Sequence, residues 1–187
     1  GERDIIIGTK NGLLIRFPET DVRSMGRTAT GVKGISLSDG DEVVGMDILE
    51  EKDDILIVTK KGYGKRTGEE EYRIQSRGGK GIKTCNVSDK NGELVSVQTV
   101  TGEEDLMVIT ANGVIIRMDV GQISRLGRNT MGVKLIRLED GPDQYVSTVA
   151  KVEKEPESED VSDEENEETI LETPANGETT ESDEGEE

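Results

Sequence analysis

The sequence predicts an all-β fold made of three propeller-like blades with four strands each, and three observations support this prediction. Residues 1–150 repeat three times with a period of about fifty residues. Each repeat contains short runs rich in Ile, Val and Leu, and glycine-containing turns separate these runs at short, regular intervals. No run is typical of a helix. Because one such sheet cannot bury both faces alone, the repeats are expected to pack on one another.

Each repeat opens with a predicted β-hairpin. A short apolar run leads into a tight turn, and a second short run that ends in arginine follows the turn. Glycine supplies the positive φ that such a turn requires. The turn glycines are Gly12, Gly62 and Gly113.

A second glycine follows each turn glycine at the same distance in every repeat. These later glycines, which we call the landmark glycines, are Gly31, Gly81 and Gly132. A third strand is predicted after each of them, over residues 32–37, 82–87 and 133–138, and a fourth over residues 43–49, 94–100 and 146–152. The constant spacing indicates that the three repeats share one fold.

The negative charge of the chain is concentrated in its last part. The chain carries 23 Lys and Arg against 41 Asp and Glu, a net charge of -18, and residues 151–187 hold 17 of the acids and 2 of the bases. Residues 154–187 contain too few apolar side chains to offset the entropy of ordering their backbone, so we predict that this acidic tail is disordered. The rest divides into blades at residues 1–50, 51–101 and 102–153.

The composition excludes several kinds of site. With no histidine and one cysteine, the chain cannot assemble a Ser/His/Asp or Cys/His nucleophile, a structural zinc site or an internal disulfide. The one thiol, Cys85, lies on an apolar run and is expected to be buried. No apolar run approaches the ~18 residues of a membrane helix, and the N-terminus lacks the basic-then-apolar pattern of a signal peptide, so we expect a cytoplasmic protein.

The chain is expected to be a piece of a longer protein. It starts at Gly1 without an initiator Met and enters an apolar strand at once. Closed propellers have about 4 to 8 blades, so three repeats are few. We therefore expect further blades upstream of Gly1.

Positive charge recurs at equivalent positions of the repeats. Residues 10–34, 60–84 and 111–135 together carry a net charge of +11, whereas the rest of residues 1–150 carries -14. Stacked blades would align these cations into a basic belt, which suits the phosphates of duplex DNA, while the scarcity of aromatic side chains argues against single strands. A merely solvated face remains the alternative. The candidate DNA contacts are Arg16, Arg27, Lys33, Lys65, Arg66, Arg77, Lys80, Lys83, Arg117, Arg128 and Lys134.

Several motifs resemble the C-terminal domain of the bacterial DNA gyrase A protein, in the form found in Gram-positive bacteria. Residues 5–17, 25–35, 72–84 and 118–138 carry the resemblance, which covers residues 2 to about 153. Within them, Gln75-Ser76-Arg77-Gly78-Gly79-Lys80-Gly81 matches the family's Gln-Arg-Arg-Gly-Gly-Lys/Arg-Gly box except at Ser76. The family's box lies in its first blade, whereas this match lies in the middle repeat, so the box's role in wrapping is not assigned to it.

The resemblance implies a six-bladed β-pinwheel, of which this chain holds the last three blades and the tail. It further implies a DNA-binding and DNA-wrapping module with no catalytic site of its own. The implied partners are double-stranded DNA, the remainder of the gyrase A protein and the gyrase B protein, in an A2B2 complex at the chromosome. That holoenzyme, a type II topoisomerase, supercoils closed circular DNA negatively. ATP and magnesium would bind elsewhere in it, so no cofactor is expected here.

Two functional alternatives and one question about the tail stay open. The chain is also compatible with the corresponding domain of topoisomerase IV, or with a propeller that serves as a scaffold for protein binding. The acidic tail either keeps the protein soluble or competes with DNA for the basic belt.

Overall fold

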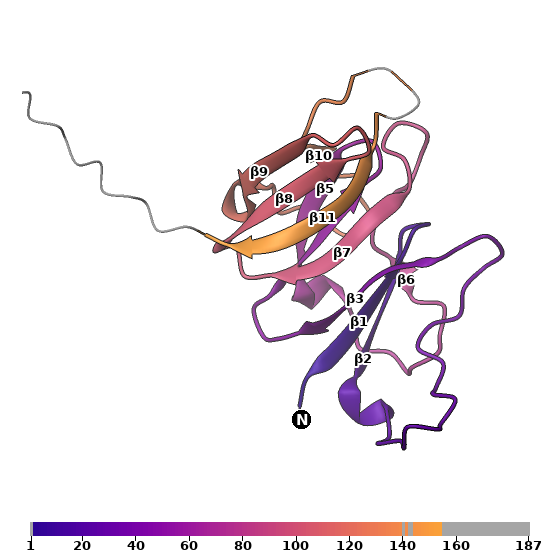
Figure 1. Cartoon of the computed structure of the whole chain (residues 1–187). Coiled ribbons are helices and arrows are strands. Elements are labelled where there is room, and N and C mark those ends of the chain that lie inside the picture. Colours follow the sequence, from indigo (N-terminus) through magenta and orange to yellow (C-terminus); the bar gives the residue numbers. More distant parts are fainter. Residues whose placement is uncertain (1, 140, 142–143, 155–187) are drawn as a thin grey trace, which may run out of the picture. The chain divides into compact units, whose positions relative to one another are not determined.

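The computed structural model describes residues 2–139, 141 and 144–154, and its strands form three antiparallel sheets (Figure 1). Sheet A contains β1 (Asp4–Thr9), β2 (Leu13–Pro18), β3 (Val43–Leu49) and β6 (Ile82–Lys83), in the order β3-β1-β2-β6. Sheet B contains β4 (Asp54–Thr59), β5 (Tyr63–Gly68), β7 (Leu94–Val100) and β10 (Val133–Lys134), in the order β10-β5-β4-β7. Sheet C contains β8 (Glu104–Thr110), β9 (Ile115–Asp119) and β11 (Val146–Glu153), in the order β11-β8-β9. The all-β prediction is confirmed.

Short 3-10 turns follow the second strand of each hairpin. They are η1 (Glu19–Asp21), η2 (Glu69–Glu71) and η3 (Val120–Gln122). The hairpins themselves form as predicted, because the turn glycines adopt the left-handed conformation that this kind of turn requires, with φ of 83° at Gly12, 78° at Gly62 and 87° at Gly113. The predicted disorder of residues 154–187 lies outside the described residues, apart from Lys154.

The outer strand of sheets A and B comes from the following repeat. β6 of the second repeat pairs with β2, and β10 of the third repeat pairs with β5. The expectation that one repeat supplies all four strands of its blade is therefore wrong. Sheet C has three strands among the described residues, and residues 32–37 of the first repeat lie in no strand.

The landmark glycines allow this exchange of strands. Gly81 and Gly132 have φ of 77° and 84°. A Cβ atom on Gly81 would lie 2.6 Å from the carbonyl oxygen of Leu14, and one on Gly132 would lie 2.6 Å from that of Gly64. Only a residue without a side chain lets the exchanged strand approach the hairpin of the preceding repeat so closely.

The core lies between the sheets. Ile55 and Ile57 of β4 pack with residues of sheet A such as Leu14, whereas Leu56 and Val58 pack with residues of the third repeat. Successive side chains of a strand point to opposite faces, so the middle sheet is covered on both sides and every residue of β4 is buried. Adjacent sheets also touch through the strand at one edge of each sheet: β3 contacts β7, and β7 contacts β11.

Two expectations from the sequence concern the one cysteine and the membrane. Cys85 is buried, as predicted, and burial raises the pKa of its thiol. Among the described residues, no helix is long and apolar enough to span a membrane.

Candidate nucleic-acid interface

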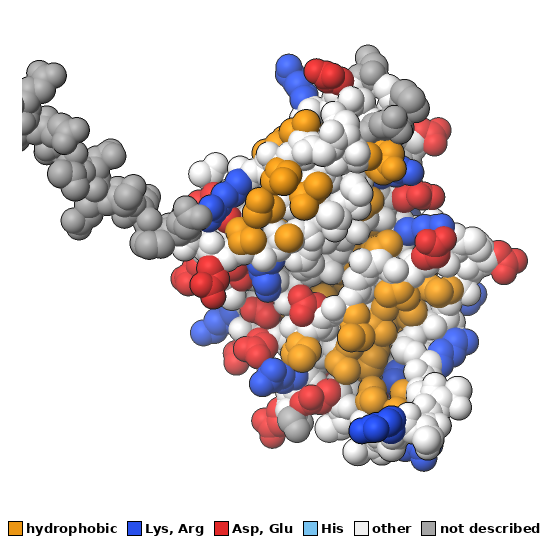
Figure 2. All heavy atoms as spheres, in the orientation of Figure 1, with side chains coloured by type: hydrophobic (Ala, Val, Ile, Leu, Met, Phe, Trp, Pro, Cys, Tyr) orange, Lys and Arg blue, Asp and Glu red, His pale blue; other side chains and the backbone are white. Residues whose placement is uncertain are grey.

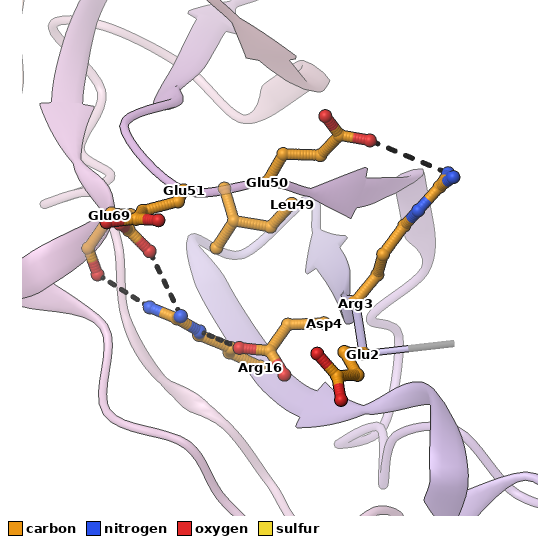
Figure 3. A pocket seen from close by; sticks show the side chains of 8 residues that line it. All are labelled: Glu2, Arg3, Asp4, Arg16, Leu49, Glu50, Glu51 and Glu69. Atoms are coloured by element: carbon orange, nitrogen blue, oxygen red, sulfur yellow. Dashed lines mark hydrogen bonds and ion pairs between the residues drawn. The ribbon is translucent and has the colours of Figure 1, made fainter.

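Three of the predicted DNA contacts, the arginines of the hairpins, face acids inside the fold, and two of them also join their repeat to the next. We call them the first set: Arg16, Arg66 and Arg117. Arg16, on β2, forms ion pairs with Asp4 at 2.6 Å and with Glu69 at 3.0 Å (Figure 3). Its Nη1 also donates to the carbonyl oxygens of Glu69 and Tyr72, at 3.0 and 3.2 Å. The side chain is only 15% exposed. Arg16 therefore directs its charge to neighbours within the fold.

The cavity that contains Arg16 is mostly acidic. It measures about 450 Å³, and Figure 3 shows the guanidinium directed toward the carboxylates of Asp4 and Glu69. Five acids and two bases are among its lining residues, which are Glu2, Arg3, Asp4, Arg16, Leu49, Glu50, Glu51 and Glu69. A phosphate group would be repelled by this lining, so the cavity is not a site for DNA.

Arg66 likewise reaches the next repeat, whereas Arg117 forms its ion pair within the third repeat. Arg66 lies 3.5 Å from Asp54, and it donates to the carbonyl oxygens of Ile123 and Gly121 in the third repeat, at 2.9 Å each. Arg117 forms an ion pair with Asp105 at 2.7 Å. The sequence holds a signal for these pairs, because an aspartate precedes the arginine by the same distance in every repeat.

Lys65 is the predicted contact that the structure places farthest from solvent. It is fully buried, and its Nζ donates to the carbonyl oxygens of Gly127 and Arg128 and to Oγ1 of Thr130, at 2.6, 2.8 and 3.1 Å. Burial lowers the pKa of this lysine to about 8. In this arrangement it does not reach a ligand at the surface.

Two arginines at equivalent positions of the second and third repeats, Arg77 and Arg128, hold the backbone of the preceding repeat. Arg77 donates from Nη1 to the carbonyl oxygen of Lys33 at 2.5 Å, and Arg128 donates to that of Lys83 at 2.7 Å. Both residues are half-buried. We call these places the A–B seam, where the second repeat packs on sheet A, and the B–C seam, where the third repeat packs on sheet B. Each seam thus brings an arginine of one repeat next to a lysine of the repeat before it.

The remaining predicted contacts are exposed, and we call them the exposed basic set. They are Arg27, Lys33, Lys80, Lys83 and Lys134. Lys83 and Lys134 lie on the short outer strands β6 and β10, where they face solvent at the edges of sheets A and B. Lys134 also places its Nζ 5.7 Å from the centre of the Tyr63 ring.

Sequence reasoning missed two further lysines beside this set. Lys61 and Lys90 line a cavity of about 270 Å³ together with Tyr63 and Lys134. The cavity lies where the hairpin turn of the second repeat meets a later part of the third repeat, which contributes Lys134, Leu138 and Gln144. These lysines do not recur in all three repeats, so a search limited to repeated positions could not find them.

The surface does not carry one continuous basic patch on the face shown in Figure 2. There, Lys and Arg side chains lie mainly toward the margins and alternate with acids, while hydrophobic side chains gather in the middle. Among the described residues, no group of three or more His, Cys, Asp or Glu side chains could hold a metal ion.

Comparison with known proteins gives one family over most of the chain. The model described as "DNA gyrase C-terminal domain, beta-propeller" matches residues 3–50, 53–101 and 104–153. The DNA gyrase A protein of Staphylococcus aureus strain NCTC 8325 / PS 47 is 51% identical over 174 residues, which is 92% of this chain and 19% of that protein. The corresponding protein of strain MRSA252 is 51% identical over 161 residues, covering 85% of this chain and 18% of its own length. The chain therefore spans about a fifth of these relatives.

Solved structures share the fold. A DNA gyrase A C-terminal domain has a TM-score of 0.73 and 26% identity, and the match covers 81% of this chain and 51% of that one. The C-terminal domain of a DNA topoisomerase IV has a TM-score of 0.75 and 24% identity, covering 82% and 47%. At that identity the second match shows the fold alone.

Proposed function

Because this chain belongs to the DNA gyrase C-terminal domain family, we propose that it is a DNA-binding and DNA-wrapping module of the gyrase A protein. The observation that carries the proposal is that each seam places an arginine of one repeat beside a lysine of the repeat before it. At the A–B seam Arg77 holds the backbone of Lys33, and at the B–C seam Arg128 holds that of Lys83. Repeated cations at a constant structural position suit the repeated phosphates of duplex DNA.

We assign different roles to the eleven predicted contacts. The exposed basic set, joined by Lys61 and Lys90, contacts phosphates. Arg77 and Arg128 hold the seams and add partly exposed charge. Arg16, Arg66, Arg117 and Lys65 serve the fold, because their charges are used by partners inside the protein.

The module works within a larger assembly in this proposal. The remainder of the gyrase A protein and the gyrase B protein complete an A2B2 complex, which supercoils closed circular DNA negatively at the expense of ATP. ATP and magnesium act in other parts of that complex in this proposal. The place of action is the bacterial chromosome in the cytoplasm.

The test is a titration of the 187-residue chain with a duplex of ~150 bp across a range of salt concentrations. A protein that neutralises Z phosphates gives a slope of log K against log salt of about -0.9Z. Substituting Lys83 and Lys134 by Gln should make the slope shallower by about 1.8. A substitution of Lys52, an exposed lysine outside the set, is the matched control and should leave the slope unchanged.

A binding curve that does not depend on salt, or no binding by a folded chain, would contradict the proposal. Circular dichroism of the same samples shows whether the β structure is intact. Folded protein without affinity for DNA would favour the alternative that the propeller is a scaffold for other proteins.

A further inference from the structure

One position in the hairpin differs among the repeats in a way that the structure explains. The residue before the first-set arginine is Ile15, Lys65 or Ile116. Lys65 is the only polar member of this set, and it is 0% exposed. A buried ammonium group needs hydrogen-bond acceptors, because its desolvation is costly.

All acceptors of Lys65 belong to one loop of the next repeat. They are the carbonyl oxygens of Gly127 and Arg128 and the hydroxyl of Thr130, at 2.6 to 3.1 Å. We call residues 127–130 the B–C loop. An ammonium group has three donors, and three acceptors surround it here.

At the A–B seam, an uncharged residue occupies the position equivalent to Lys65. Ile15 is the counterpart of Lys65, and Gly79 is the counterpart of Thr130. A Cβ atom on Gly79 would lie 3.6 Å from Cδ1 of Ile15, so the isoleucine packs against the corresponding loop of the second repeat. The two seams thus use alternative pairs of residues: isoleucine with glycine at one, lysine with threonine at the other.

The B–C loop connects Lys65 to the exposed basic set. Arg128 belongs to this loop, and its guanidinium donates to the carbonyl oxygen of Lys83 at 2.7 Å. The backbone N–H of Arg128 is held by Glu71 at 2.7 Å. If Lys65 were lost, the carbonyl oxygen of Arg128 would lose this donor, whereas that of Gly127 would keep the hydroxyl and the backbone N–H of Thr130, at 2.9 and 3.2 Å. The loss of the ammonium group is therefore expected to loosen the loop at Arg128.

We propose that Lys65 is a positioning residue of the DNA-binding surface, which holds the B–C loop so that Arg128 and Lys83 keep their place at the edge of the sheet. This inference rests on the proposed function of the chain. It differs from a direct phosphate contact, because Lys65 acts through the loop and not through its own charge on DNA.

The first experiment compares duplex DNA binding by four forms of the 187-residue chain: the unchanged chain, Lys65→Ile, Thr130→Gly and the double variant Lys65→Ile/Thr130→Gly. The double variant recreates the residue pair of the A–B seam. We expect Lys65→Ile alone to weaken binding about fivefold, and the double variant to return to within about twofold of the unchanged chain. A direct phosphate contact predicts the opposite for the double variant, which still lacks the ammonium group and would stay weak.

A second comparison separates positioning from a general effect on stability. All binding is measured well below the unfolding temperature of each variant, as followed by circular dichroism. In the background of Arg128→Ala, Lys65→Ile should weaken DNA binding by less than about twofold, because the residue that it positions is already missing. Fully additive losses would overturn the proposal.

Amide hydrogen exchange tests the loop without DNA. Exchange at residues 126–131 should become faster in Lys65→Ile and return toward the original rate in the double variant, while residues 76–80 of the A–B seam serve as the internal reference and should not change. Unchanged exchange in Lys65→Ile would contradict the proposal that Lys65 holds the B–C loop. Failure of the unchanged chain to bind DNA would instead overturn the proposed function and the DNA role of Lys65 with it, so the two failures are distinguishable.

Discussion

At the scale of single residues, the repeated basic side chains lie in two kinds of surroundings. Arg16 and its equivalents carry the same charge as Lys33 and its equivalents, and both sets recur with the same period. Their surroundings differ, because the arginines face aspartates on the neighbouring strand whereas the lysines face solvent. Mutations in the two sets should therefore have separable effects on folding and on DNA binding.

Arg16→Ala should lower the free energy of unfolding by about 2 kcal/mol, because it leaves Asp4 and Glu69 without their shared partner in a largely buried place. The salt slope of DNA binding should not change in this variant. Arg27→Ala, at an exposed position, should change stability by less than about 0.5 kcal/mol and make the salt slope shallower by about 0.9. Urea denaturation and DNA titration of both variants measure the two effects, and a swapped pattern would contradict the assignment.

The lowered pKa of Lys65 is expected to make the stability of the protein depend on pH. Burial lowers its pKa in the folded state to about 8, below the 10.5 of an ordinary lysine, so between these values the unfolded chain binds more protons. Stability should therefore rise as the pH increases from 8 to 10.5. Glu71, Arg128 and the Cys85 thiol are the other groups that act on this lysine, and the Lys65→Met variant retains them all.

The difference between the two proteins isolates the contribution of Lys65. Relative to Lys65→Met, the unchanged chain should gain up to about 3 kcal/mol of stability across this pH range. Urea denaturation at several pH values between these limits measures this difference. A difference that stays constant with pH would mean that the lysine titrates normally in the folded state.

At the scale of elements, the sequence predicts the hairpins correctly but does not predict which strands pair with them. Apolar runs and turn glycines predict β1, β2 and their equivalents, because these are local features. The sequence does not show that β6 and β10 pair with the preceding repeat. Such a strand recurs every fifty residues or so whether it pairs with its own repeat or with the one before it. The ion pairs of Arg16, Arg66 and Arg117 had a trace in the aspartate that opens each hairpin, whereas the burial of Lys65 depends on a loop of the next repeat.

A series of glycine substitutions tests the exchange of strands. Gly81→Ala should destabilise the protein by more than about 2 kcal/mol, because a Cβ atom there would meet the Leu14 carbonyl and would also need a left-handed backbone. Gly31→Ala has the same backbone requirement and open space around it, so about 1 kcal/mol is expected. Gly26→Ala meets neither obstacle and should have an effect below about 0.5 kcal/mol. Equal losses at Gly31 and Gly81, measured by urea denaturation, would argue against the close approach.

At the scale of the whole molecule, the seams make the three repeats one unit. Sheets A and B each take a strand and a set of hydrogen bonds from the next repeat, and the apolar clusters lie between the sheets. The exposed lysines are placed by the same seams. A change that loosens a seam is therefore expected to affect both stability and the arrangement of the exposed basic set that we propose to contact DNA.

The acidic tail is the largest opposing charge in the chain, and its effect on DNA binding can be measured directly. Residues 154–187 carry 16 acids and 1 base, so in dilute salt they should compete with phosphates for the exposed basic set. Removing them should tighten DNA binding at about 50 mM salt, and the gain should fade as salt screens the competition. A chain whose tail has the same length but Gln and Asn in place of Glu and Asp is the matched control, and it should bind as the truncated chain does. If both altered chains bind no more tightly than the original, the tail contributes to solubility alone.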